Sequence, residues 1–258
     1  MARSKETDVA RLYHLNSSNI KGHIPDLTVD NDRHPLRFRS YAGSKRTDLP
    51  GRDFQLDISL GEALRERRSK RDFLLRPLEL EAVGRLLYAS YGLRGYRQFE
   101  GESFYDRPTP SAGALYPLEL YIAAQEVNQL PDGIYHYDAR AHQLEEMRTG
   151  VFHTQLAELT IGQNMIKDAN RVVMIAATFQ RTMWKYGQRG YRYVWLDAGH
   201  VGQNLYLVAG ALGLGSVAIG GFFDDALNRL IGLPGEETVI YLLCIGQPKE
   251  ISDPPAAD

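Results

Sequence analysis

Basic side chains and one hydroxyl are concentrated between Arg65 and Arg71, in the run RERRSKR. Arg67, Ser69 and Arg71 stand at alternate positions, so their side chains would point the same way in an extended segment. Two guanidinium forks beside a hydroxyl form a suitable site for a phosphate group. Cations at the end of a helix also interact favourably with the helix dipole and suit a solvent-exposed surface. The residues alone leave a phosphate site and a solvated face equally open.

A second group that could do chemistry is the pair Lys185-Tyr186, in a segment rich in aromatic and basic residues. A lysine beside a tyrosine can supply proton-transfer groups if burial lowers the pKa of the lysine. The alternative is a surface loop with aromatic anchors. Asp197 and His200 follow, three residues apart, but no third metal ligand has convincing spacing. We therefore expect them to form a buried hydrogen-bonded pair, and we expect no metal site.

Glycines are frequent in ALGLGSVAIGGF, from Ala211 to Phe222. A dinucleotide fingerprint needs the order strand, glycine loop, helix, whereas here a helix comes first. Gly213 and Gly215 are therefore expected to end the helix and to permit close packing. Gly220 and Gly221 follow a strand, where bare backbone N–H groups could face a flat ligand. An ordinary turn is the alternative.

The loop PSAGALYP, from Pro110 to Pro117, consists of small residues between two prolines. Gly113 gives it access to unusual backbone angles. Such a loop can lie against a ring without clashing. It could equally be a plain connection into the strand that follows.

The elements that must position these groups include both helices and strands. Ser59 and Glu62 have the capping-box spacing, which predicts a helix from there to about residue 68. A polar loop is expected from Gly95 to Pro110. Further helices are expected at 78–91, 151–161, 191–212 and 226–231, and strands at 118–125, 133–137, 142–147, 171–179, 216–219 and 238–245. Without regular alternation of strands and helices, this order indicates an α+β fold.

The predicted helix at 191–212 is apolar on every face, with Arg192 and Asp197 as its two fully charged residues. Such a helix must be buried nearly all round. A chain of this size rarely offers that environment, whereas a homodimer that packs this helix against its symmetry mate does.

The ends of the chain differ from its middle. Residues 1–55 are polar and predict an extended arm, in which the basic residues are expected to be solvated. Order is expected to begin at Ser59, and residues 251–258 are expected to form a disordered tail. The basic residues of the arm are Arg33, Arg37, Arg39, Lys45, Arg46 and Arg52.

Composition excludes several function classes. The net charge of -2 provides no field for nucleic acid. Neither a signal peptide nor a membrane span is expected, which favours the cytoplasm. Cys244, the one cysteine, lies in an apolar run and is expected to be buried and unreactive. Redox chemistry would have to come from a cofactor.

Taken in order, these segments resemble the flavin-dependent nitroreductase superfamily, and most closely its SagB-type dehydrogenase branch. The resemblance rests on RRSKRDF (67–73), PSAGALYPLELY (110–121), YGQRGYRYVWLDAGHVGQNL (186–205), GLGSVAIGGF (213–222) and IGQP (245–248). It implies a nitroreductase-like domain over 56–250, with an antiparallel-rich sheet flanked by helices. It also implies an intertwined homodimer with two FMN sites at the subunit interface, which agrees with the apolar helix.

The resemblance further implies roles for single residues. The FMN phosphate, ribityl chain and N1/C2 edge would be bound by Arg67, Arg68, Ser69 and Arg71. The loop Pro110, Ser111, Ala112 and Gly113 would pack on the ring from the other subunit, and Gly220 and Gly221 would lie near N5 and O4. Lys249 is the nearest candidate for the phosphate-binding cation usual at the C-terminal end. Lys185 and Tyr186 occupy the place of a pair regarded as catalytic in azoline-oxidising members.

The function so implied is an FMN-dependent dehydrogenase that oxidises a small or peptide-embedded substrate, of the azoline-to-azole type, within a possible biosynthetic complex. An NAD(P)H-dependent nitroreductase, quinone reductase or ene reductase is the first alternative. It is weakened because Ala114 and Tyr116 replace the Asn and Gln of the ring loop in nitroreductases. The second alternative is a non-catalytic flavin-binding partner subunit.

Overall fold

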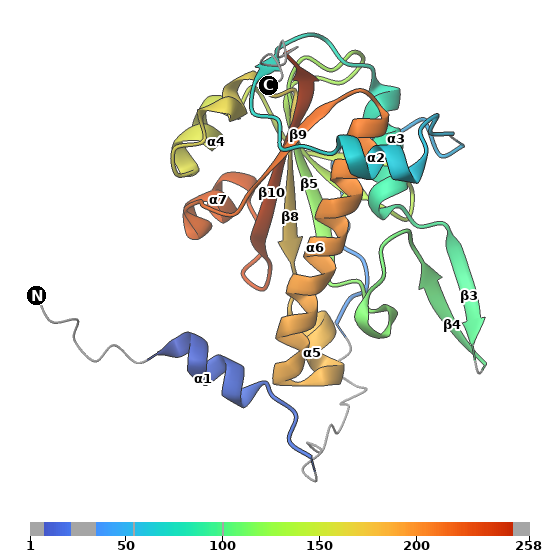
Figure 1. Cartoon of the computed structure of the whole chain (residues 1–258), viewed down its shortest axis with the longest axis vertical. Coiled ribbons are helices and arrows are strands. Elements are labelled where there is room, and N and C mark those ends of the chain that lie inside the picture. The colour runs from blue at the N-terminus through green and yellow to red at the C-terminus, as the bar shows by residue number, and fades with distance from the viewer. Residues whose placement is uncertain (1–7, 22–34, 54, 100, 250–258) are drawn as a thin grey trace, which may run out of the picture.

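The centre of the molecule is an antiparallel sheet. The computed structural model describes residues 8–21, 35–53, 55–99 and 101–249. Within them the strands run in the order β1-β7-β6-β5-β8-β10-β2, and β9 also pairs with β10 (Figure 1). The strands of this sheet are β1 (Arg46–Asp48), β2 (Phe73–Leu74), β5 (Leu118–Ala124), β6 (Gly133–Asp138), β7 (Gln143–Thr149), β8 (Arg171–Ala177), β9 (Gly215–Ile219) and β10 (Thr238–Pro248). The predicted α+β class is confirmed.

Helices cover both faces of the sheet. One core lies between the sheet and helices α3 and α6, and the other lies between the sheet and helices α4 and α7. From Val172 to Ala177, successive residues of β8 alternate between the two cores, which explains the apolar run there. The helices are α1 (Val9–Asn16), α2 (Leu60–Glu66), α3 (Leu80–Tyr91), α4 (His153–Leu159), α5 (Gln180–Tyr186), α6 (Gln188–Ala211) and α7 (Asp224–Ile231), with 3₁₀ turns η2 (Ala112–Ala114) and η3 (Asn164–Asp168).

Two helix ends follow the sequence signals closely. The side chain of Ser59 accepts from the backbone N–H of Glu62 and caps α2. At the end of α6, Gly213 has a φ of 71°, and the N–H of Leu214 bonds to the carbonyl of Ala209. This pattern closes the helix with a left-handed glycine, as predicted for Gly213.

The long helix differs from its prediction at its start. It begins at Gln188 and is preceded by a separate helix, α5, with Gly187 between them at a φ of 53°. Within a single chain α6 is not buried on all sides, because Trp195 is 44% exposed and Leu196 is 60% exposed. One apolar face of α6 therefore remains open in the isolated chain.

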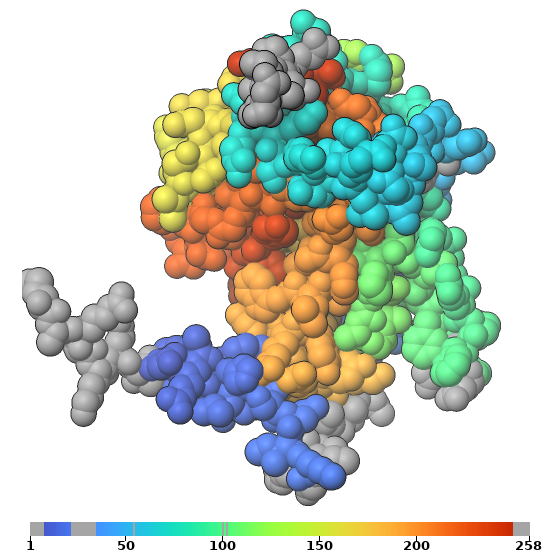
Figure 2. All heavy atoms as spheres, viewed as in Figure 1, coloured from blue at the N-terminus to red at the C-terminus, as the bar shows by residue number. Residues whose placement is uncertain are grey.

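The predicted polar loop at 95–110 is wrong. These residues form a hairpin of β3 (Gly95–Phe99) and β4 (Glu102–Asp106), which projects from the body of the molecule (Figure 2). Its rings pack on one another, with 5.3 Å between the centroids of Tyr96 and Tyr105. Because the hairpin stands away from the core, its strands lack the alternation of apolar and polar residues that identifies a half-buried strand.

The N-terminal arm contains more structure than predicted, and order begins well before Ser59. Helix α1 is capped by the carboxylate of Asp8 and is held against α6 by Arg189 and Arg192, which donate to the backbone or hydroxyl of Ser17. Strand β1 extends the sheet beside β7. Both elements are short, and their contacts are with residues far along the chain, so local periodicity does not reveal them. The predicted tail at 251–258, and Arg33, lie outside the described residues.

Two arm arginines pair with buried carboxylates, which the prediction of solvated charges did not include, although Arg46 itself is half-exposed. Arg39 Nε lies 3.3 Å from Glu237, and Arg46 Nη2 lies 3.1 Å from Glu145. Both carboxylates are buried beneath the arm. They belong to a group that we call the buried ionic network, which consists of Arg39, Arg46, Glu119, His136, Glu145, Arg181 and Glu237.

The centre of the buried ionic network is His136, whose ring lies between two carboxylates. Its Nε2 is 3.2 Å from Glu119 and its Nδ1 is 3.0 Å from Glu145. Burial alone would lower the pKa of His136, but the hydrogen bonds to Glu119 and Glu145 raise it to about 9. Arg181 of α5 also bonds to Glu119, at 2.6 Å. The network therefore joins the arm, the sheet and α5.

Two further observations concern the chain as a whole. Cys244 is free and buried, as predicted, and burial raises the pKa of its thiol to about 12. Among the described residues, no helix is both long enough and apolar enough to cross a lipid bilayer. The proposed domain boundaries at 56 and 250 remain predictions.

Candidate functional site

The basic residues between 65 and 71 lie beside strand β9. After α2 ends at Glu66, the backbone runs extended, with Ser69 bridged to Ser216 and the N–H of Lys70 bonded to the carbonyl of Ser216. We call Arg65, Arg67, Arg68, Lys70 and Arg71 the cation cluster. The extended course that the alternate spacing required is therefore present.

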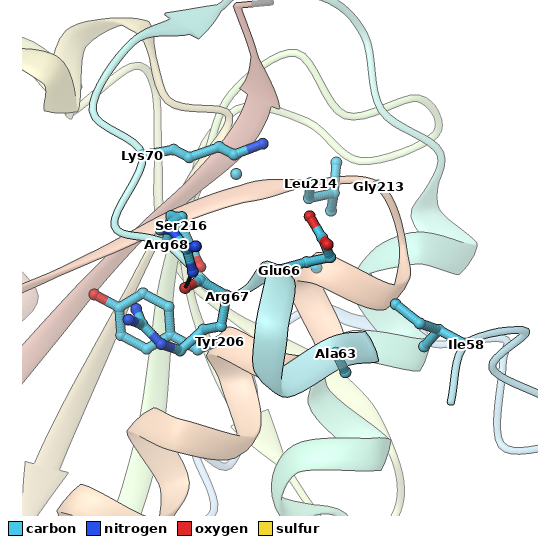
Figure 3. A pocket seen from close by; sticks show the side chains of 12 residues that line it. Ile58, Ala63, Glu66, Arg67, Arg68, Lys70, Tyr206, Gly213, Leu214 and Ser216 are labelled. Atoms are coloured by element: carbon cyan, nitrogen blue, oxygen red, sulfur yellow. Dashed lines mark hydrogen bonds between the residues drawn. The ribbon is translucent and has the colours of Figure 1, made fainter. Parts of the chain in front are cut away.

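A small cavity of about 140 Å³ opens between the cation cluster and the end of α6. Figure 3 shows the side chains of Arg67, Arg68 and Lys70 around it, with Glu66 on the opposite wall. Ser69 and Arg71 are exposed and are not part of the lining. The full lining is Ile58, Ala63, Glu66, Arg67, Arg68, Lys70, Tyr206, Gly210, Gly213, Leu214, Gly215 and Ser216.

The charges of this cluster are poorly compensated. Arg65 pairs with the neighbouring Glu66 at 3.5 Å, and Arg68 donates to backbone carbonyls. Over the described parts of the chain, Arg67, Lys70 and Arg71 take part in no ion pair. The cavity therefore offers positive charge and free N–H donors to an anion.

Tyr206 of α6 is a cavity residue that the sequence analysis missed. Its hydroxyl accepts from the N–H of Ala218 at 2.7 Å and lies 3.1 Å from the hydroxyl of Ser69. The guanidinium of Arg67 sits over its ring, 5.4 Å from the centroid (Figure 3). Helical spacing was the signal that could have identified Tyr206. It precedes Gly210 by four positions, so both residues lie on the same face of the helix, and that face leads to the glycine-rich stretch.

The glycines of that stretch have different surroundings. A Cβ at Gly215 would come within 3.1 Å of Pro248 and 3.2 Å of Lys70, so close packing explains this glycine. A Cβ at Gly220 would meet no atom within 4 Å. Packing within the chain therefore gives no reason for the absence of a side chain at Gly220. Gly221 is held by its carbonyl, which accepts from the N–H of Ile161.

The loop from Pro110 to Gly113 is fixed by Asp197 of α6. Ser111 donates to the Asp197 carboxylate at 2.5 Å, and its own oxygen accepts from the N–H of Tyr116 at 2.9 Å. Burial raises the pKa of Asp197 to about 6, against the lowering effect of the bonds from Ser111 and Ala112. The expected pair of Asp197 and His200 is thus wrong, since His200 is exposed and the loop supplies the partners of Asp197.

Lys185 and Tyr186 lie directly against this loop. A Cβ at Gly113 would lie 2.6 Å from the Tyr186 hydroxyl and 3.4 Å from the Lys185 ammonium nitrogen. Gly113 itself has a φ of 61°, which favours glycine for a second reason. Burial raises the pKa of Tyr186, and the nearby Tyr193 and Asp197 raise it further. The pair and the loop therefore form one local site.

A cavity of about 290 Å³ lies beside the same loop, and its lining does not include Lys185 or Tyr186. It opens beside the N-terminal half of α6 and is lined by Pro110, Ser111, Ala112, Tyr193, Leu196, Asp197 and His200. Among the described residues, no group of three or more His, Cys, Asp or Glu side chains could hold a metal ion.

The two sites lie at opposite ends of α6 (Figure 1). Tyr193 belongs to one and Tyr206 to the other, and their separation of thirteen positions corresponds to about 20 Å along the helix axis. Lys249 lies on the side of the cation cluster, where its N–H bonds to the carbonyl of Asp72. Its side chain is exposed.

Comparison with protein families gives one match that decides the classification. Residues 64–247, which include both sites, match the model of the nitroreductase family. The chain belongs to the nitroreductase family. Membership makes it an oxidoreductase and confirms the fold that the sequence motifs predicted.

The relatives of this nitroreductase-family protein fall into two groups. MJ1384 of Methanocaldococcus jannaschii, assigned as a nitroreductase, is 36% identical over 191 residues, which are 74% of this chain and 92% of that protein. The microcin B17-processing protein McbC of Escherichia coli is 29% identical over 53% of this chain and 52% of McbC. The trifolitoxin-processing protein TfxB of Rhizobium leguminosarum is 26% identical over 73% of this chain. The chain spans about half the length of McbC and TfxB, and these two relatives support the SagB-type branch.

Solved structures confirm the nitroreductase fold. A protein of Anabaena variabilis, assigned as a nitroreductase, superposes with a TM-score of 0.76 at 28% identity, over 96% of this chain and 49% of that one. The E. coli microcin synthetase McbBCD complex, with truncated pro-MccB17 bound, contains a chain that superposes with a TM-score of 0.63 at 20% identity, over 94% of this chain and 92% of that one. The latter likeness concerns the fold alone.

The residues present fit the flavin that the family implies. The first cavity offers uncompensated cations suited to a phosphate, and Gly220 leaves a strand end open where a flat ring could approach. At about 140 Å³ this cavity is smaller than the roughly 300–1,000 Å³ of typical small-molecule sites, so it suits one end of such a ligand.

Proposed function

We propose that this protein is an FMN-dependent dehydrogenase of the SagB type, which oxidises a small or peptide-embedded substrate. The observation that carries the proposal is the contact of Lys185 and Tyr186 with Gly113 of the loop expected to face the flavin ring. Proton-transfer groups are thereby held beside the loop that would lie on a redox cofactor.

The cation cluster supports the phosphate end of this site. Arg67 and Arg68 line the cavity, and Ser69 and Arg71 follow on the extended segment beside β9. We assign the phosphate to Arg67 and Ser69, and we retain Lys249, whose backbone is bonded to Asp72, as a further cation of the site. Gly220 and Gly221 would face the reactive edge of the ring.

We infer that the working form is a homodimer in which each site uses both chains. The loop from Pro110 to Gly113 and the pair Lys185-Tyr186 lie far from the cation cluster of their own chain, at the other end of α6. The exposed apolar face of α6, which includes Trp195 and Leu196, would be covered by the second chain. On this arrangement the loop and the Lys-Tyr pair reach the site together, from the partner.

The proposed reaction removes two hydrogens from an azoline ring and leaves an aromatic azole. When bound, FMN supplies the acceptor for a hydride. Lys185 or Tyr186 takes the accompanying proton, and the contact of both with the loop fixes their position relative to the substrate face. Asp197 holds the loop itself through Ser111. A peptide substrate, and partner proteins of a biosynthetic complex, are favoured by the relatives that process microcin B17 and trifolitoxin.

The first test is the visible spectrum of the purified protein together with its mass in solution. A yellow dimer with one releasable FMN per chain is expected. Gly220→Ala should leave the unfolding temperature unchanged, because the added methyl would meet no atom of the protein within 4 Å. It should lower FMN affinity, because on this proposal the methyl would occupy space that the flavin ring needs. A colourless monomer that takes up no FMN would refute the proposal.

A reductase is the second candidate function, since MJ1384 is assigned as a nitroreductase and a 57-residue segment is 39% identical to an NADPH-flavin oxidoreductase of Vibrio harveyi. Rapid bleaching of the bound flavin by NAD(P)H would favour it over the dehydrogenase. If replacement of both Lys185 and Tyr186 by Ala leaves oxidation of an azoline peptide unchanged, the pair has no catalytic role. A non-catalytic flavin-binding subunit would then become the better description.

A further inference from the structure

Tyr206 connects three separate segments at the cavity beside the cation cluster. It projects from α6, its hydroxyl bonds to the backbone of β9 at Ala218 and to Ser69, and its ring carries the guanidinium of Arg67. We propose that Tyr206 is a positioning residue that orients Ser69 and Arg67 for a phosphate monoester, and so makes the site select FMN over riboflavin. This inference rests on the proposed function.

One of the two hydrogen bonds at the Tyr206 hydroxyl has a fixed direction, since the N–H of Ala218 donates to the phenol oxygen at 2.7 Å. The hydroxyl of Ser69 lies 3.1 Å from the same oxygen, and either hydroxyl can be the donor in this contact. A phosphate dianion only accepts, so with a phosphate bound Ser69 donates to the phosphate and accepts from Tyr206. Such chains polarise their members, so Ser69 becomes a stronger donor toward an anion.

The ring of Tyr206 orients the second phosphate ligand. Arg67 is only half-buried and takes part in no ion pair among the described residues. An arginine without a partner loses side-chain entropy when it is fixed on a ligand. Its position over the Tyr206 ring, 5.4 Å from the centroid, restricts it in advance through a cation–π contact. Ser69 and Arg67 are thus presented together by a single side chain.

The consequence is specific to the phosphate group. Riboflavin carries the same ring and ribityl chain as FMN but has a hydroxyl where FMN has a dianionic phosphate. Loss of the Tyr206 hydroxyl should therefore weaken FMN binding and leave riboflavin binding unchanged. A general loosening of the fold would weaken both.

The experiment is a fluorescence titration of flavin-free protein with FMN and, separately, with riboflavin. For Tyr206→Phe we expect the Kd for FMN to rise about tenfold, as for the loss of a hydrogen bond to a charged group, with the Kd for riboflavin unchanged. Tyr206→Leu should raise the Kd for FMN further, because the cation–π contact is lost as well. Tyr96→Phe is the matched control, since Tyr96 lies on the exposed hairpin, and it should change neither constant.

A double-mutant cycle separates positioning from a merely structural role. If Tyr206 acts through Ser69, the double variant Ser69→Ala with Tyr206→Phe should bind FMN about as well as Ser69→Ala alone. Additive losses would overturn the inference, as would an unchanged ratio of the two dissociation constants in Tyr206→Phe. If Tyr206→Phe fails to fold, Ser69→Ala alone still tests the inference. A preference for FMN over riboflavin as large as that of the wild type in Ser69→Ala would overturn the inference. Wild-type protein that binds neither flavin would refute the proposed function instead.

Discussion

The buried ionic network around His136 and the cation cluster around Arg67 use the same residue types in opposite ways. In the network, three carboxylates and His136 are buried, and each has at least one charged partner within 3.3 Å. In the cation cluster, the charged groups are exposed or half-buried, and Arg67, Lys70 and Arg71 take part in no ion pair within the described ranges. Buried charges that are paired with opposite charges hold elements together. Cations beside a cavity that have no such partner are available to bind an anionic ligand.

The difference shows why the number of charges in a segment does not by itself reveal a site. The arm, with Arg39 and Arg46, and the segment from Arg65 to Arg71 are both rich in arginine. The arginines of the arm find carboxylates on strands and loops roughly 100 or 200 residues away. The two segments differ in whether the fold places carboxylates beside their arginines.

The largest expected effect comes from removing one carboxylate of the network. Glu119→Gln leaves Arg181 and His136 without their shared anion, so the free energy of unfolding should fall by about 3–5 kcal/mol, measured by urea denaturation. Glu236→Gln is the control, because Glu236 is an exposed partner of Arg39 and should cost less than about 1 kcal/mol. Equal losses in the two variants would remove the distinction between buried and open charges.

A smaller effect should appear when the network is titrated. The folded protein holds the pKa of His136 at about 9, above the ordinary 6.5. The contribution of protonated His136 to the free energy of unfolding is therefore complete below about pH 6.5 and is lost as the pH rises through 9. The unfolding temperature of the wild type should fall over this range, and the fall should be shallower in His136→Gln. An identical slope in both proteins would show that His136 is not charged in the folded state.

The cation cluster should respond in binding and not in stability. Arg67→Ala should weaken FMN binding by about 2 kcal/mol, the size of a hydrogen bond to a charged group, as followed by flavin fluorescence. Its unfolding temperature should stay close to that of the wild type, because Arg67 has no charged partner to leave behind. Arg65→Ala is the matched control, since Arg65 lies outside the cavity lining. A large loss of stability in Arg67→Ala would place Arg67 among the structural charges.

The smallest effect concerns salt. Raising the salt concentration from 0.05 to 0.5 M should weaken FMN binding several-fold, because screening acts strongly on exposed charges. The difference in unfolding free energy between the wild type and Glu119→Gln should hardly change, because the network is buried. If salt removed that difference, the network would have to be accessible to solvent.

Much of the fold could be predicted because its signals are local. Ser59 caps α2 through a residue three positions away, and Gly213 closes α6 through its immediate neighbours. The apolar run of β8 is visible because both of its faces are buried. The hairpin of β3 and β4 gave no such signal, since most of β3 is exposed and β4 is only partly covered, and β1 depends on pairing with β7 about 100 residues away.

The candidate site was predicted only in part, for a similar reason. The motifs identified the cation cluster, the loop at Pro110 and the Lys185-Tyr186 pair, and the structure brings the last two together. Tyr206 was missed because its role depends on Ser69 and Ala218, which meet it only in the folded chain. Asp197 was recognised as a candidate, but its partner is Ser111 and not the nearby His200.

The place of β10 in the sheet has a consequence for how the chain is made. This strand is formed near the C-terminal end of the sequence, yet it lies inside the sheet, between β8 on one side and β9 and β2 on the other. Until β10 leaves the ribosome, β8 presents an open edge that is apolar from Val172 to Ala177, the kind of edge that promotes aggregation. The 71 residues from the end of β8 to the end of β10 take roughly 4–14 s to synthesise. Each nascent chain therefore spends several seconds with the edge of β8 unpaired, a state in which a chaperone could prevent aggregation.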